Sequence, residues 1–126
     1  METILVVDDV QTDRELMGRV VMQAGHTPIY AENGMEAIEV AKSKRPALIL
    51  MDVVMPDQDG FKTTRDLRQD PETSKIPIVL VTSKGTESDR FWGKRQGADD
   101  HVVKPFSPDE LLRLIQRYAT LKRVSS

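Results

Sequence analysis

The feature that most constrains the fold is the regular recurrence of short apolar runs separated by helix-forming stretches. The runs cover residues 4–7, 28–31, 47–51, 78–81 and 101–103. The first, third and fourth lack polar alternation, which is typical of strands buried on both faces of a parallel sheet. The second and fifth are weaker, so we expect them at the edges of the sheet.

Helix-start signals follow the apolar runs. Thr12 and Glu15 have the spacing of a capping box, and Leu16, Val20 and Ala24 would then share one helix face. The pattern therefore predicts a first helix that begins at Thr12.

The remaining helices have comparable signals at their ends. Helix starts are predicted at Asn33, Gln58, Thr86 and Ser107. Gly97 suits a left-handed cap at the end of the fourth helix, and the last helix should end near Leu121.

The element order is therefore βαβαβαβαβα. Right-handed crossovers of this kind give a parallel sheet covered by helices on both faces, a three-layer α/β fold. A chain of 126 residues has room for one such domain. We expect the domain to cover residues 1–122, with a disordered tail at 123–126 and no output domain.

Composition excludes several classes of protein. The sequence has no cysteine, which removes disulfides and thiolate chemistry, and its net charge of −2 gives no sign of a nucleic-acid partner. The longest apolar run, 47–51, is far shorter than the roughly 20 residues of a membrane span. We expect a cytoplasmic protein without membrane insertion.

Polar residues follow the predicted strands and should meet at one edge of the sheet. These residues are Asp8, Asp9, Asp52, Thr82 and Lys104. Clustered carboxylates repel one another, and a divalent cation relieves the repulsion. Hard oxygen donors favour Mg²⁺ (or Mn²⁺), while the lysine and the hydroxyl suit a phosphoryl group. Because no Gly-rich nucleotide loop is present, we expect an aspartate to accept the group covalently as an acyl phosphate.

Four motifs in order make the chain resemble a response-regulator receiver domain of the chemotaxis-regulator kind. They are Val7-Asp8-Asp9, Met51-Asp52-Val53-Val54-Met55-Pro56 with Asp59-Gly60, Val81-Thr82-Ser83, and Val103-Lys104-Pro105-Phe106. The stretch 91–98 further resembles stand-alone regulators of twitching motility and type IV pilus chemotaxis-like systems. The resemblance implies a flavodoxin-like sheet with strand order 2-1-3-4-5 and five helices.

The resemblance also implies a metal site and a phosphoacceptor. Asp52 would be the phosphoacceptor. Asp9 and Asp52 would bind Mg²⁺ directly, together with the backbone carbonyl of Val54, and Asp8 would hold a metal-bound water.

The switch residues are implied in the same way. Lys104 would pair with the acyl phosphate and Thr82 would bond one of its oxygens, while a cis bond before Pro105 would form a tight turn. The family usually has Tyr or Phe where this chain has His101. Histidine is smaller and can become charged, so coupling between Thr82 and an aromatic ring is in question here.

We therefore predict a stand-alone phosphoacceptor that is not an enzyme in the ordinary sense, although it would promote its own phosphorylation and dephosphorylation. Its donor would be a histidine kinase or a histidine phosphotransfer domain. A monomer would signal by protein contact through the fourth helix, fifth strand and fifth helix, roughly 90–118. The resemblance implies that the positions of Val54 and Lys84 help to set how fast the acyl phosphate is hydrolysed. Val54 offers no group to orient water, so we expect a long-lived acyl phosphate.

Other functions remain open. A receiver can serve as a phosphate sink or as a phosphorelay intermediate without a target of its own. The same fold also carries small phosphatases and flavin-binding modules. A phosphatase would want a second aspartate at the position of Val54, and the pair Asp8-Asp9 would repel a flavin phosphate.

Overall fold

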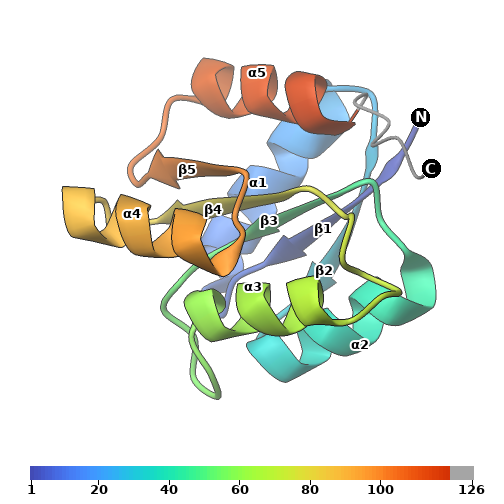
Figure 1. Cartoon of the computed structure of the whole chain (residues 1–126). Helices are drawn as coiled ribbons and strands as arrows, with labels where there is room; N and C mark the ends of the chain where they lie inside the picture. Colours follow the sequence, from blue (N-terminus) through green and yellow to red (C-terminus); the bar gives the residue numbers. More distant parts are fainter. Residues whose placement is uncertain (120–126) are drawn as a thin grey trace.

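The computed structural model describes residues 1–119 as a parallel sheet between two layers of helices (Figure 1). The elements are β1 (Thr3–Val7), α1 (Gln11–Gln23), β2 (Thr27–Ala31), α2 (Gly34–Lys44), β3 (Leu48–Met51), α3 (Gly60–Gln69), β4 (Ile78–Thr82), α4 (Glu87–Gln96), β5 (Asp100–Val103) and α5 (Pro108–Ala119). The predicted end of the last helix near Leu121 and the predicted tail lie outside the described residues.

The sheet has five parallel strands in the order β2-β1-β3-β4-β5. This order confirms the flavodoxin-like topology that the sequence predicts. The two weaker apolar runs are the edge strands, because an edge position leaves part of each strand open to solvent.

Alternate residues of the central strands feed two separate cores. Ile4 and Val6 of β1 pack in one core with α1 and α5, whereas Leu5 and Val7 pack in the other with α2 and α3. Successive strand side chains point to opposite faces, so a strand between two helix layers must be apolar throughout. This is why the uninterrupted apolar runs predicted buried strands correctly.

The predicted start of the first helix was wrong. Helix α1 begins at Gln11 with Val10 as its N-cap residue, and no side chain caps it there. The carboxylate of Asp8 accepts a hydrogen bond from the Val10 amide, which turns the chain into the helix before Thr12. The buried face consists of Met17, Val20 and Val21, and the predicted face member Leu16 is 42% exposed.

The other helix starts agree better with the prediction. Asn33 caps α2 and Thr86 forms a capping box with Asp89 at α4, while Gly97 ends α4 in the left-handed conformation. The side chain of Ser107 accepts from the Glu110 amide at the start of α5. Helix α3 begins at Gly60 rather than Gln58, because the Asp59 side chain caps it.

Within residues 1–119, none of the helices combines the length and the apolar character needed to cross a membrane.

Candidate functional site

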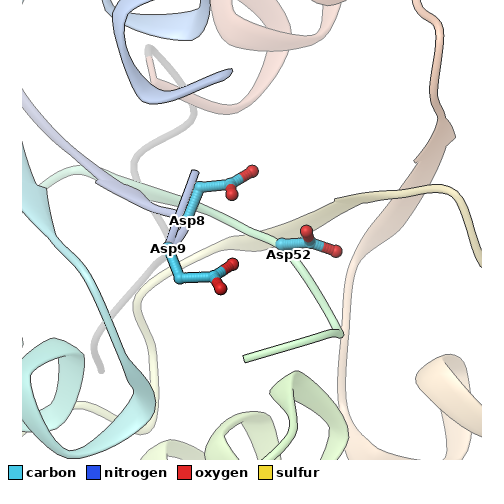
Figure 2. Close-up of side chains that lie close together, drawn as sticks. All are labelled: Asp8, Asp9 and Asp52. Carbon is cyan, nitrogen blue, oxygen red and sulfur yellow. The ribbon is translucent and has the colours of Figure 1, made fainter. Parts of the chain in front are cut away.

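The three predicted carboxylates meet at the carboxyl edge of the sheet. Asp8 and Asp9 follow β1, and Asp52 follows β3, which lies beside β1 in the sheet (Figure 2). One oxygen from each side chain lies within 4.8 Å of the other two. This separation would let all three surround a single cation, so the predicted site residues are brought together.

Asp8 is the most deeply placed of the three. Its side chain is fully buried, and Oδ1 accepts a hydrogen bond from the Val10 amide at 2.9 Å. Burial raises the pKa of Asp8, and the hydrogen bonds from Lys104 and Val10 offset this only in part. Desolvation of a charge is costly unless other charges compensate it, so the site favours a nearby cation.

Lys104 supplies a positive charge at the same place. It follows β5 and precedes Pro105, and the peptide bond between the two residues is cis, as the resemblance implied. Its Nζ atom lies 2.7 Å from Oδ2 of Asp8 and 3.2 Å from Oδ2 of Asp52. Burial alone would lower the pKa of Lys104, but hydrogen bonds to the surrounding carboxylates raise it above its ordinary value. The ammonium is therefore charged at neutral pH.

A fourth carboxylate at the site, Asp13, was missed in the sequence. Its Oδ2 accepts a hydrogen bond from Nζ of Lys104 at 2.8 Å. Asp13 lies in the first turn of α1, directly after the Asp8-Asp9 pair. The signal that could have found it is positional, because the first turn of a helix that follows a strand lies at the same edge as the strand end.

Thr82 and His101 are linked through the loop between β4 and α4. Oγ1 of the buried Thr82 accepts a hydrogen bond from the Lys84 amide at 3.2 Å. Nε2 of His101, on β5, lies 2.8 Å from the Lys84 carbonyl oxygen. The backbone of Lys84 therefore connects the threonine at the site to the histidine on the edge strand.

The loop after β3 holds Asp52 in place. The amide of Val54 donates to Oδ1 of Asp52 at 3.2 Å, and the Val54 side chain is 49% exposed. The amide of Gly60 donates to the Val53 carbonyl at 2.8 Å, which brings the start of α3 against the chain beside Asp52. A side chain at Gly60 would overlap the backbone oxygen of Asp52. This close approach explains why the Asp59-Gly60 pair belongs to the motif.

The sequence matches the family described as "Response regulator receiver domain" over residues 4–116. The chain belongs to this family. The match includes residues of all five strands and most of α5, and it contains all five residues predicted at the sheet edge.

Curated relatives of this receiver domain differ in how much of their own length it covers. Protein PilH of Pseudomonas aeruginosa is 44% identical over 115 residues, which cover 91% of this chain and 95% of PilH. The phosphate regulon transcriptional regulatory protein PhoB of the same species is 39% identical over 122 residues, which cover 97% of this chain and 52% of PhoB. The chain therefore spans nearly all of PilH but about half of PhoB.

Solved receiver structures share the fold closely. The chemotaxis protein CheY4 of Vibrio cholerae has a TM-score of 0.87 at 32% identity, with 94% of this chain and 98% of that chain covered. The receiver domain of a sensor histidine kinase from Pseudomonas aeruginosa, solved with a magnesium ion in its active-site cleft, has a TM-score of 0.87 at 28% identity, with 95% and 98% covered. Receiver domains take part in two-component signalling, so a histidine kinase or phosphotransfer domain is the expected class of donor.

Proposed function

We propose that this receiver domain accepts a phosphoryl group on Asp52 from a phosphohistidine and signals by protein contact in motility or chemotaxis-like control. The observation that carries the proposal is that Asp52 lies both in the carboxylate cluster with Asp8 and Asp9 and 3.2 Å from the ammonium of Lys104. A carboxylate oxygen of Asp52 would attack phosphorus and form a new O–P bond. The P–N bond of the donor would break, and its electron pair would leave with the imidazole nitrogen.

Mg²⁺ suits the donor set of the site. The residues that would hold it are Asp9, Asp52 and the backbone carbonyl of Val54, with Asp8 bonded through a water. Support comes from the 4.8 Å cluster of carboxylate oxygens and from the magnesium ion in the related sensor-kinase receiver. When bound, the ion would neutralise negative charge on the phosphoryl oxygens.

Lys104 and Thr82 would then recognise the acyl phosphate. Lys104 is charged and already within 3.2 Å of Asp52, so it can donate to a phosphoryl oxygen with little movement. The Thr82 hydroxyl can donate its own hydrogen to another phosphoryl oxygen while it accepts from Lys84. A shift of Thr82 would move the Lys84 backbone and with it the hydrogen-bond partner of His101.

The hydrogen bonds from Thr82 through the Lys84 backbone end at His101, which lies on the surface where we propose that the downstream partner binds. A groove between α4, β5 and α5 is lined by His101 together with the residues Arg90, Arg113 and Arg117. The arginines favour an acidic segment on the partner, although Asp100 and Glu110 also line the groove. We propose that the chain binds there as a monomer.

The acyl phosphate should be long-lived. Val54 stands two residues after Asp52 and its exposed side chain is apolar, so it supplies no group that could orient an attacking water. Self-dephosphorylation would then be slow, with a lifetime of minutes or longer. Retention of the phosphoryl group for seconds only would contradict this part of the proposal.

The test is phosphoryl uptake from acetyl phosphate, followed by intact mass with and without Mg²⁺. The native protein, Asp52→Asn and the control Asp109→Asn, an exposed carboxylate in the first turn of α5, would be compared. We expect one added phosphoryl group in the native and control proteins, dependent on Mg²⁺, and none in Asp52→Asn. Equal labelling of Asp52→Asn would overturn the assignment of the phosphoacceptor.

A further inference from the structure

Asp13 contacts the lysine that would recognise the acyl phosphate, and it does so from the solvent side of the site. The Asp13 side chain is 36% exposed, compared with 16% for Lys104, 9% for Asp52 and none for Asp8. Its bond to Nζ of Lys104, at 2.8 Å, is shorter than the bond between Lys104 and Asp52. Asp13 is therefore a carboxylate that solvent reaches and that still holds the ammonium.

The hydrogen bonds of Lys104 limit what it can offer to a new anion. An ammonium has three N–H donors, and Nζ lies within hydrogen-bond distance of Asp8, Asp13 and Asp52. A bond to a phosphoryl oxygen must replace one of these three. Release of Asp8 would leave a buried carboxylate unpaired, which is costly, whereas water can solvate a released Asp13.

The charge on Asp13 acts against phosphorylation even if its bond to Lys104 persists. A phosphoryl oxygen and the Asp13 carboxylate would then both contact one nitrogen, so their negative charges would lie roughly 4–5 Å apart. Repulsion at that distance in a well-solvated site corresponds to about a fivefold change in an equilibrium or rate constant. Either geometry makes Asp13 a competitor of the phosphoryl group.

We propose that Asp13 is a positioning residue that holds Lys104 in the unphosphorylated protein and thereby restrains phosphorylation of Asp52. The inference rests on the proposed function of Asp52. It gives Asp13, in the first turn of α1, a part in setting the rate at which Asp52 is phosphorylated.

The experiment compares Asp13→Asn and Asp13→Ala with the native protein and with Glu15→Gln, an exposed carboxylate on the same helix. Initial rates of phosphoryl uptake from acetyl phosphate would be read by intact mass at fixed Mg²⁺. In this reaction the Asp52 O–P bond forms, the acetyl O–P bond breaks, and acetate leaves with the electron pair. We expect uptake about fivefold faster in both Asp13 variants and unchanged in Glu15→Gln.

A second readout separates competition from a general structural effect. Affinity for beryllofluoride, a mimic of the phosphoryl group, would be measured by ¹⁹F NMR at low salt and at about 1 M salt, where screening is strong. We expect tighter binding in both variants at low salt and a smaller difference from the native protein at high salt.

The outcomes distinguish this inference from the proposed function. If the native protein is labelled on Asp52 but Asp13→Ala is slower while Asp13→Asn is unchanged, Asp13 supports Lys104 rather than restraining it, and the inference is overturned. Uptake rates in Asp13→Asn and Asp13→Ala that equal the native rate overturn it as well. If the native protein itself takes up no phosphoryl group, both the inference and the proposed function are wrong.

Discussion

The ammonium nitrogen of Lys104 lies 2.7 Å from Oδ2 of Asp8, a fully buried carboxylate 96 positions earlier in the sequence. The contact joins the chain after β5, at one edge of the sheet, to the chain after β1 near its other side. The site therefore exists only when all the intervening strands are paired. The contact with Asp8 also means that Lys104 stabilises the folded domain, in addition to its proposed role at the phosphorylation site.

Replacement of Lys104 should destabilise the metal-free protein. In Lys104→Met the buried carboxylate of Asp8 loses its cation, so we expect the free energy of unfolding at neutral pH to fall by about 3 kcal/mol. Urea denaturation in EDTA measures this change. Lys94→Met, at an exposed position on α4, is the matched control and should change stability by less than about 0.5 kcal/mol. Equal stability of the two variants would contradict the pairing.

Mg²⁺ should stabilise the folded protein, because it binds the carboxylate cluster only when that cluster is assembled. At about 100 times its dissociation constant, the ion should raise the free energy of unfolding by about 2.7 kcal/mol, and EDTA should remove this gain. Asp9→Asn loses one of the clustered oxygens as a charged ligand and should respond much less at the same Mg²⁺ concentration. An equal response in both proteins would place the ion elsewhere.

Substitution of Gly60 should disturb Asp52 directly. A Cβ atom there would overlap the backbone oxygen of Asp52 and lie 2.9 Å from Cα of Val53, and neither backbone atom can turn away as a side chain can. We expect Gly60→Ala to lower the free energy of unfolding by about 2 kcal/mol and to slow phosphoryl uptake.

Gly93→Ala is the control for that experiment. Its new Cβ would lie 2.9 Å from Cδ1 of Leu80, the end of a flexible side chain, and alanine favours the helix. We expect stability within about 1 kcal/mol of the native protein and unchanged uptake. If Gly60→Ala matches Gly93→Ala in stability and in phosphoryl uptake, the loop after Asp52 can shift to accommodate the added Cβ atom, which would contradict the prediction.

His101 should be fixed in one tautomer when neutral. Its Nε2 lies 2.8 Å from the Lys84 carbonyl, which can only accept, so Nε2 must donate. The Nδ1 atom is buried, and within residues 1–119 it has no hydrogen-bond partner. Long-range ¹H–¹⁵N NMR spectra should show the proton on Nε2, with His26→Gln used to assign the signals. A proton on Nδ1 would break the proposed link from Thr82 to the output surface.

The strands could be predicted from the sequence where burial on both faces alone determines the pattern of apolar residues. Strands buried on both faces leave uninterrupted apolar runs, so β1, β3 and β4 could be located within one or two residues. The start of α1 could not, because Thr12 and Glu15 have capping-box spacing without the matching backbone. There the Asp8 side chain, itself part of the site, turns the chain first.

The site was predictable for the residues directly after the strands and not for those that reach it from helices or distant loops. Asp8, Asp9, Asp52, Thr82 and Lys104 occupy strand ends, whose convergence follows from parallel topology. Asp13 reaches Lys104 from a helix turn, and only the three-dimensional path of α1 shows that it points there. The burial of the His101 Nδ1 atom likewise depends on packing that local sequence does not specify.

The cap that Asp57 provides at the start of α2 is another contact that the local sequence could not predict. Asn33 was predicted to cap α2, and it accepts from the Glu36 amide at 2.8 Å. The loop after β3 adds a second cap, because the Asp57 carboxylate accepts from the amides of Gly34 at 2.9 Å and Met35 at 2.8 Å. Nothing near residue 34 in the sequence indicates this partner.

This second cap should make part of the stability dependent on pH. Desolvation alone would raise the pKa of Asp57, but the amide hydrogen bonds outweigh it and lower the pKa below its ordinary value of 3.8. A carboxyl whose pKa is lower in the folded state stabilises the fold at pH above that ordinary value. The contribution is lost as pH falls through the lower, folded-state value.

We therefore expect Asp57→Asn to lower the free energy of unfolding by about 0.5–1 kcal/mol at pH 7, the size typical of a charge at a helix N-terminus. The difference from the native protein should begin to shrink as the pH falls below 3.8. It should be smallest below the folded-state pKa, where Asp57 is protonated and as uncharged as the asparagine. Urea denaturation at a series of pH values measures it, with Glu39→Gln, an exposed carboxylate on α2, as the control. A difference that stays constant down to the acid transition would mean that hydrogen-bond geometry, rather than the Asp57 charge, stabilises the start of α2.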